Sequence, residues 1–91
     1  MKIQLCNMRL TGNNKRYFEN RLQEFADLLP TTLDRDIASV QFGRQDSRGG
    51  FSITLVDQSG CVPMQKFFDD KSEMLGFVIG YLSANSTQKY L

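Results

Sequence analysis

Alternation of apolar and polar residues is the first pattern visible along this chain, and it predicts short strands with one buried face. The clearest stretch is residues 51–55, where three apolar residues alternate with a serine and a threonine. Less regular stretches predict three further strands, over residues 2–10, 38–42 and 61–67. The first of these changes phase after Leu5, which favours a bulge or an early end. Because Pro63 cannot donate a backbone hydrogen bond, the last strand should lie at an edge or a bulge.

Two longer stretches have apolar residues at the three-to-four-residue spacing of a helix. The first covers residues 15–29, and Pro30 is predicted to end it, since proline disfavours helix continuation. The second covers residues 74–84. It follows an aspartate at position 70 and a glutamate at position 73, which have the spacing of a capping box.

The resulting order of elements is β-α-β-β-β-α, which predicts an α+β fold forming one domain over residues 1–91. Residues 85–91 have no apolar period, so we expect a frayed tail there. The first two strands, joined through a helix, can lie parallel, whereas hairpins join the later strands antiparallel. Both helices should cover one face of a four-stranded mixed sheet. The other face should carry mostly uncharged polar residues, namely Gln4, Ser39, Gln41, Ser52, Thr54 and Gln65.

The composition excludes several kinds of chemistry. The chain has no histidine, which removes the commonest general base and every imidazole metal site. Two carboxylate pairs, at positions 34 and 36 and at positions 69 and 70, are explained by turns and a helix cap. We therefore predict no catalytic residue, no metal site, no cofactor and no enzymatic activity.

Cysteine usage and the absence of a targeting pattern predict a cytoplasmic protein. Cys6 and Cys61 are far apart in the sequence and lie in predicted strands, so we expect reduced, buried thiols rather than a redox pair or metal site. The N-terminal segment has no continuous apolar core of a signal peptide. The longest apolar run, residues 74–82, is shorter than the roughly 20 residues that cross a bilayer, so no membrane association is expected.

The last predicted helix is the first candidate for an interaction site. At roughly 100° per residue its apolar side chains cover an arc of about 200°, wider than a one-sided surface helix needs. Glycine inside a helix costs about 1 kcal/mol relative to alanine, so a close backbone approach should compensate for Gly76 and Gly80. Either the first helix fills this glycine groove, or another chain does, a second copy included. The candidate interaction residues are Met74, Gly76, Phe77, Gly80 and Tyr81.

Basic residues form the second candidate. They occur around the start of the first helix and in the polar loop between the second and third strands, where two arginines flank Asp46. If the loop folds over the helix start, these side chains would hold a phosphate or another anion; the alternative is a solvated loop. The residues concerned are Arg9, Lys15, Arg16, Arg44 and Arg48.

The element order β-α-β-β-β-α resembles the fold of the small ribosome-hibernation factors, and its last five elements are similar to double-stranded RNA-binding domains. This resemblance implies contact with RNA through lysine and arginine side chains on helices, whereas here the last helix, MLGFVIGYL, is apolar. The small size also resembles accessory proteins of bacteriophages and mobile elements that block a host protein.

Two functions follow as expectations from these observations. The first is a non-enzymatic protein-interaction or regulatory domain that uses the last helix or the groove beside it, with self-association as a homodimer as its simplest case. The second is a domain that binds RNA or another anion through the basic residues.

Overall fold

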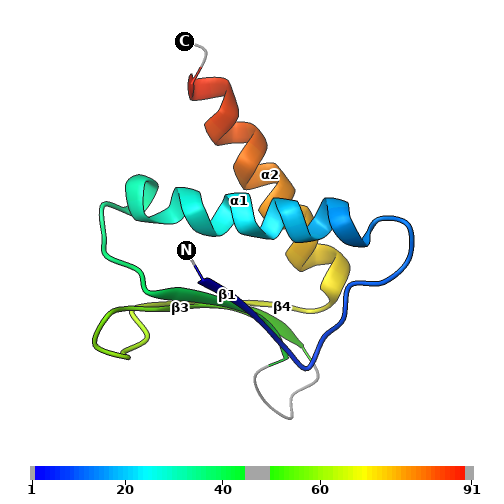
Figure 1. Cartoon of the computed structure of the whole chain (residues 1–91), viewed down its shortest axis with the longest axis horizontal. Helices are drawn as coiled ribbons and strands as arrows, with labels where there is room; N and C mark the ends of the chain where they lie inside the picture. The colour runs from blue at the N-terminus through cyan, green and yellow to red at the C-terminus, as the bar shows by residue number, and fades with distance from the viewer. Residues whose placement is uncertain (1, 45–49, 90–91) are drawn as a thin grey trace.

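The computed structural model describes residues 2–44 and 50–89, and it confirms the predicted α+β class and element order. The six elements, in chain order, are β1 (Lys2–Cys6), α1 (Lys15–Leu33), β2 (Ser39–Gly43), β3 (Phe51–Val56), β4 (Met64–Phe68) and α2 (Lys71–Lys89). The strands form one sheet in the order β1-β2-β3-β4, with β1 parallel to β2 and the other neighbours antiparallel. Both helices lie on one side of this sheet (Figure 1).

The helix-facing side of the sheet contains the core. Val40 and Phe42 of β2 and Ile53 and Leu55 of β3 are buried against apolar side chains of both helices. These four positions follow the period of two that the sequence showed, because successive strand residues point to opposite faces. The full buried apolar set is Leu10, Leu22, Phe25, Ala26, Leu29, Ile37, Val40, Phe42, Ile53, Leu55, Met74, Leu75 and Val78.

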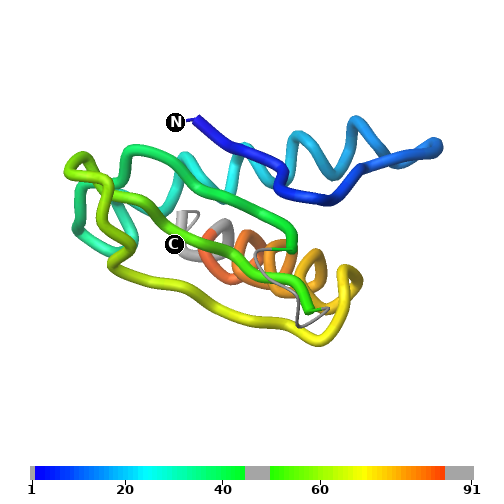
Figure 2. Tube along the Cα trace, turned by 90° about the horizontal axis from the view of Figure 1, so that it is seen from below, coloured from blue at the N-terminus to red at the C-terminus, as the bar shows by residue number. Residues whose placement is uncertain are grey.

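The other face of the sheet carries no helix in the described part of the chain (Figure 2). The strand register aligns Gln4, Gln41, Thr54 and Gln65 in one row across all four strands. Within this row the Gln41 amide donates to Gln4 and the Gln65 amide donates to the Thr54 hydroxyl. The polar face predicted from the sequence is therefore confirmed, including Ser39 and Ser52, although Ser52 and Thr54 on the central strand are buried.

The two helices differ from the prediction at their ends. Pro30 does not end α1, which continues to Leu33 and ends where Asp34 adopts the left-handed conformation with a φ of 50°. The backbone N–H of Arg35 then donates to the Pro30 carbonyl, as in a Schellman cap. Proline is tolerated here because it sits in the last turn, where it removes one hydrogen bond and kinks little of the helix.

The cap of α2 at Asp70 is as predicted, but the helix begins at Lys71, three residues before the predicted start, and its end also differs. The Asp70 carboxylate accepts from the Glu73 N–H at 2.8 Å, and the Glu73 carboxylate accepts from the Asp69 N–H at 2.9 Å. The first bond is that of a capping box, whereas the returning bond from Glu73 reaches the N–H one residue before the cap. At the other end α2 continues to Lys89, well into the segment that we expected to be a frayed tail.

The predicted strand bounds are too long at β1 and β4. β1 ends at Cys6, where Asn7 has a φ of 52° and turns the chain towards α1. β4 begins directly after Pro63, so Cys61 lies in the preceding loop and is exposed, contrary to the buried thiol expected there. Cys6 is partly buried, and both cysteines are free thiols. As Pro63 indicated, β4 is an edge strand.

Gly43 allows the ends of β1 and β2 to approach each other. Its φ is +129°, and a Cβ atom at this position would lie 2.0 Å from the carbonyl oxygen of Cys6. We predict that Gly43→Ala lowers the free energy of unfolding by more than about 2 kcal/mol, because backbone strain adds to this overlap. Urea denaturation measures the loss. Gly12→Ala is the control, since Gly12 also has a positive φ but an added Cβ meets nothing within 4 Å; an equal loss in both variants would contradict the prediction.

Asp57 closes the turn between β3 and β4. Its carboxylate accepts from the Ser59 hydroxyl at 2.6 Å, the Ser59 N–H at 2.9 Å and the Cys61 N–H at 3.0 Å. The hydrogen bond from the Ser59 hydroxyl, followed by those from backbone N–H groups, holds the pKa of Asp57 below its ordinary value of 3.8.

A lowered carboxyl pKa stabilises the fold above the unfolded pKa, and this stabilisation is lost as the pH falls through the folded pKa. We predict that Asp57→Ala is less stable than the native chain at pH 7 and that the difference shrinks below about pH 4. Urea denaturation of both chains between pH 7 and pH 3 measures it. A difference that stays constant over this range would show that the ionised carboxylate does not stabilise the turn.

Candidate functional site

The candidate site is an apolar groove between the two helices and the β4 side of the sheet. α2 starts beside the end of β4 and then rises past α1, away from the sheet (Figure 1). The two helices touch where they cross, but α1 contacts β1 while α2 contacts β3 and β4. Between them the sheet is not fully covered. The groove left there has a cavity volume of about 90 Å³ and is partly open to solvent.

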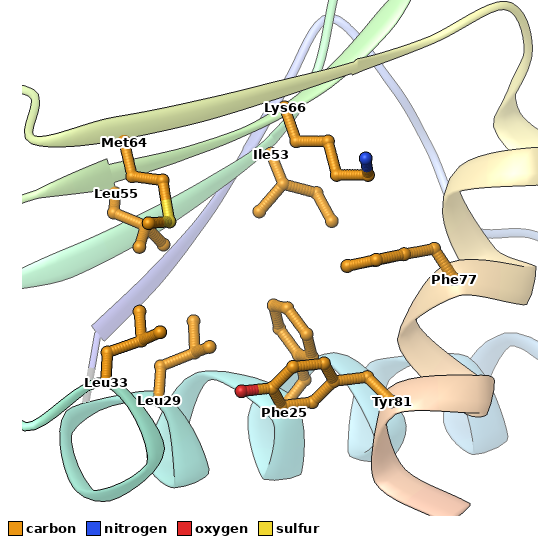
Figure 3. A pocket seen from close by; sticks show the side chains of 9 residues that line it. All are labelled: Phe25, Leu29, Leu33, Ile53, Leu55, Met64, Lys66, Phe77 and Tyr81. Atoms are coloured by element: carbon orange, nitrogen blue, oxygen red, sulfur yellow. The ribbon is translucent and has the colours of Figure 1, made fainter. Parts of the chain in front are cut away.

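Side chains from four elements line the groove, and Figure 3 shows them around its empty centre. α1 contributes three apolar side chains, β3 and β4 contribute two each, and α2 contributes two aromatic rings. The lining residues are Phe25, Leu29, Leu33, Ile53, Leu55, Met64, Lys66, Phe77 and Tyr81. Among these nine residues, the Lys66 amine and the Tyr81 hydroxyl are the only polar side-chain groups. We therefore define this set as the β4 groove, a site suited to apolar contact.

Three aromatic rings hold one end of the β4 groove in place. Phe25 meets the rings of Phe77 and Tyr81 edge to face, with centroid distances of 6.1 and 5.2 Å. Such pairs stabilise by about 0.5–1.5 kcal/mol beyond burial alone. The Tyr81 hydroxyl donates to the Thr32 hydroxyl at 2.7 Å, which fixes the tyrosine on α1. This end of the groove is consequently preformed.

Lys66 lies at the open side of the groove. Its partner in the sheet register is Ile53, so its side chain points to the helix-facing side although β4 is an edge strand. The amine rests over the rings of Phe77 and Phe68, 5.3 and 5.7 Å from their centroids. In the described residues no carboxylate lies within ion-pair distance of it. The groove therefore has one cation at its rim with an aromatic face on one side.

The strand beside the groove is exposed along most of its length. β4 has β3 on one side and no strand on the other in the described part of the chain. Met64, which points to the groove, is 49% exposed, and Phe67, which points to the opposite face, is 60% exposed. Unpaired strand edges with exposed apolar side chains are sites where another strand can add.

The interaction residues predicted on the last helix do not form one surface. Met74 is fully buried in the core, so it supports the fold and is not available to a partner. Phe77 and Tyr81 are partly buried and line the β4 groove. Gly76 and Gly80 are exposed, and an added Cβ at either position meets nothing within 4 Å. The expectation that α1 fills a glycine groove is therefore wrong: α1 packs against the aromatic side of α2.

The predicted basic residues that the structure describes belong to separate segments, which lie at the end of the sheet where both helices begin (Figure 1). Arg44 follows β2; its N–H donates to the Cys6 carbonyl and its guanidinium lies over the Phe51 ring. Arg9 lies in the segment before α1, and its carbonyl accepts from the Lys71 amine. Lys15 and Arg16 are exposed in the first turn of α1. Arg48 lies outside the described residues, so the loop on which the predicted patch depends is not placed.

Carboxylates and cysteines do not gather into a metal or acid-base site among the described residues. Asp34 ends α1, and Asp69 and Asp70 take part in the cap of α2. Sequence reasoning missed Met64 and Lys66 as site residues. The alternation along β4 could have identified them. Positions 64 and 66 alternate with Gln65 and Phe67, so their side chains lie on the face of the sheet that carries the core.

Comparison with known proteins gives no assignment: no known family matches the chain, and no curated protein is significantly similar to it. Neither helix, over the residues that the structure describes, is long and apolar enough to cross a bilayer.

The exposed glycines of α2 lead to a prediction about self-association. Because an added Cβ at either position meets nothing within 4 Å in the described part of the chain and their φ values are helical, the double variant Gly76→Ala/Gly80→Ala should raise the free energy of unfolding by about 1–2 kcal/mol. Thermal unfolding measures the gain. Analytical ultracentrifugation of the native chain and the variant shows whether the glycines serve a second copy. A native dimer that the double variant loses would show that they do, and a loss of stability would contradict the prediction.

Proposed function

We propose that this chain is a non-enzymatic protein-interaction domain that binds an extended segment of another protein along β4, with an apolar side chain of that segment in the β4 groove. One observation carries the proposal: a preformed apolar groove opens directly beside an unpaired edge strand. A small regulatory domain or a phage-encoded inhibitor would also act by binding a segment of another protein.

Strand addition explains why the two features lie together. An extended segment that pairs with β4 satisfies the outer backbone N–H and C=O groups of the strand, which gives affinity without sequence preference. Its alternate side chains then project over the helix-facing side, where Met64 and Lys66 project. The groove provides a pocket for one such side chain, and pockets for alternate side chains provide specificity.

Burial of apolar surface is the main contribution that the groove can make to the free energy of binding. Six of its nine lining residues are aliphatic or phenylalanine side chains that are buried or half-buried in the free domain, namely Phe25, Leu29, Leu33, Ile53, Leu55 and Phe77. Filling the groove with one leucine-sized side chain removes the remaining apolar surface from water, which contributes about 1.5–3 kcal/mol. The rings held by Thr32 and Phe25 need little rearrangement to receive it.

A second copy of the chain fits β4 less well than a different partner. Antiparallel pairing of two β4 strands about a two-fold axis at Lys66 places two amines opposite each other, and like charges there are destabilising. An axis at Gln65 places each Met64 opposite a Lys66 of the other copy, which leaves both amines without a carboxylate. The edge of this sheet therefore favours a segment of other composition over the homodimer expected from the sequence.

The RNA- or anion-binding alternative has less support. It needs the basic side chains on one surface. The ends of β1 and β2, beside Arg44, and the starts of both helices, beside Arg9, Lys15 and Arg16, are at the same end of the sheet (Figure 1). The Arg44 guanidinium lies over the Phe51 ring, however, and the carboxylates of Asp70 and Glu73 at the start of α2 stand at this same end, where they would oppose an anion.

The experiment is a search with a library of randomised dodecapeptides displayed on phage, followed by titration of an enriched peptide into isotope-labelled protein. We expect the backbone amide signals of β4 and the groove residues to shift. Met64→Glu should weaken the enriched peptide at least tenfold, because it places a carboxylate where the apolar anchor lies. Circular dichroism verifies that each variant is folded.

The matched control is Gln65→Glu, which introduces the same charge one residue along β4 on the opposite face. It should leave the affinity of the peptide within about twofold of the native value. Failure of the library to enrich any peptide, or equal effects of the two substitutions, would contradict the proposed function.

A further inference from the structure

We infer that the β4 groove selects a segment in which a carboxylate follows or precedes the apolar anchor by two residues, and that Lys66 binds this carboxylate. The inference rests on the proposed function and adds the chemistry of the partner. Its starting point is the position of Lys66, two residues beyond Met64 on the same face of the same edge strand.

The spacing follows from strand geometry. Side chains on one face of a strand recur every two residues, about 6.6 Å apart. An added strand has the same period, so if one of its side chains lies beside Met64, the side chain two residues away lies beside Lys66. The groove extends under Met64 and is bounded by Lys66 (Figure 3). The apolar anchor and the residue facing Lys66 are therefore two positions apart in the bound segment.

The charge of Lys66 decides which residue faces it. Its amine has aromatic faces on one side and, in the described part of the chain, no carboxylate partner. The two rings leave N–H donors of the ammonium for other acceptors, since Lys carries three. A partner carboxylate would accept a charge-assisted hydrogen bond there, at the rim of an apolar groove.

Two other occupants fit the observations less completely. A basic segment would fill the groove but would place a second positive charge beside the Lys66 amine. A neutral segment would fill the groove but would leave the amine without a charged partner. A fatty acid would match the groove and the amine with its tail and carboxylate, but it would leave the outer edge of β4 unpaired. Only an extended segment with an apolar and an acidic residue meets the groove, the edge and the amine together.

The experiment sorts the same dodecapeptide library in parallel against the native chain and three variants. Lys66→Glu reverses the charge at the rim, and Lys66→Met removes it while keeping an unbranched side chain of similar length. Lys15→Glu is the matched control, because it makes the same change of net charge at the N-terminal end of α1, away from the groove (Figure 1).

The native chain and Lys15→Glu should enrich aspartate or glutamate two positions from an apolar residue about fivefold over the unselected library. Lys66→Met should keep the apolar preference and lose the acidic one. Lys66→Glu should enrich lysine or arginine at that position instead. This reversal is a result that a purely structural role of Lys66 would not produce.

The opposing outcomes separate this inference from the proposed function. Enrichment of the apolar residue alone by all four chains, with binding still abolished by Met64→Glu, would overturn the acidic preference and leave strand binding in place. Absence of enriched peptides in every sort would overturn both. Titration with decanoate is the last arm: shifts of the Phe77 and Tyr81 signals without any enriched peptide would show that the occupant is an amphiphile, and the inference would be wrong.

Discussion

The packing of Phe25 against Phe77 and Tyr81 is the contact on which the rest of this surface depends. Two helices that lay side by side along the sheet would cover it fully, as in most α+β domains. Here the three rings hold the helices where they cross, and α2 departs from the sheet beyond this point (Figure 1). The uncovered strip beside β4 is the geometric consequence. The groove thus follows from the crossing of the helices, and Tyr81, hydrogen-bonded to Thr32, sets its position, whereas the exposed edge beside it follows from the place of β4 at the end of the strand order.

The strands could be predicted from the sequence because their information is local. Alternation at residues 51–55 acts over a few residues, and the structure has β3 where the pattern indicated. The end of α1 could not be predicted from Pro30 alone. Whether a proline ends a helix depends on the cap that follows, and here Asp34 in the left-handed conformation provides one a turn later.

The candidate site was harder to predict than the fold, because it depends on the angle between two helices. The sequence showed that α2 has more apolar circumference than one contact needs, but not which neighbour covers each part. Met74 is covered by the core, whereas Phe77 and Tyr81 cover the end of a groove, and all three belong to the same apolar arc. The glycines lie on the remaining side, where α1 does not reach. Their cost to the helix is not compensated by any contact within the described chain.

In the proposed mode of binding, the positive charge of Lys66 has both a protective role and a recognition role. Inward-pointing charge on an edge strand is a recognised means of preventing edge-to-edge aggregation, and a domain with Met64 and Phe67 exposed on one edge has need of it. The same positive charge that opposes a second β4 strand attracts a carboxylate at the identical place. Protection alone would be served equally well by a glutamate at this position, or by a lysine pointing to the open face. A lysine resting on aromatic rings at the rim of an apolar groove does more, because it makes the edge selective for the sign of the partner's charge.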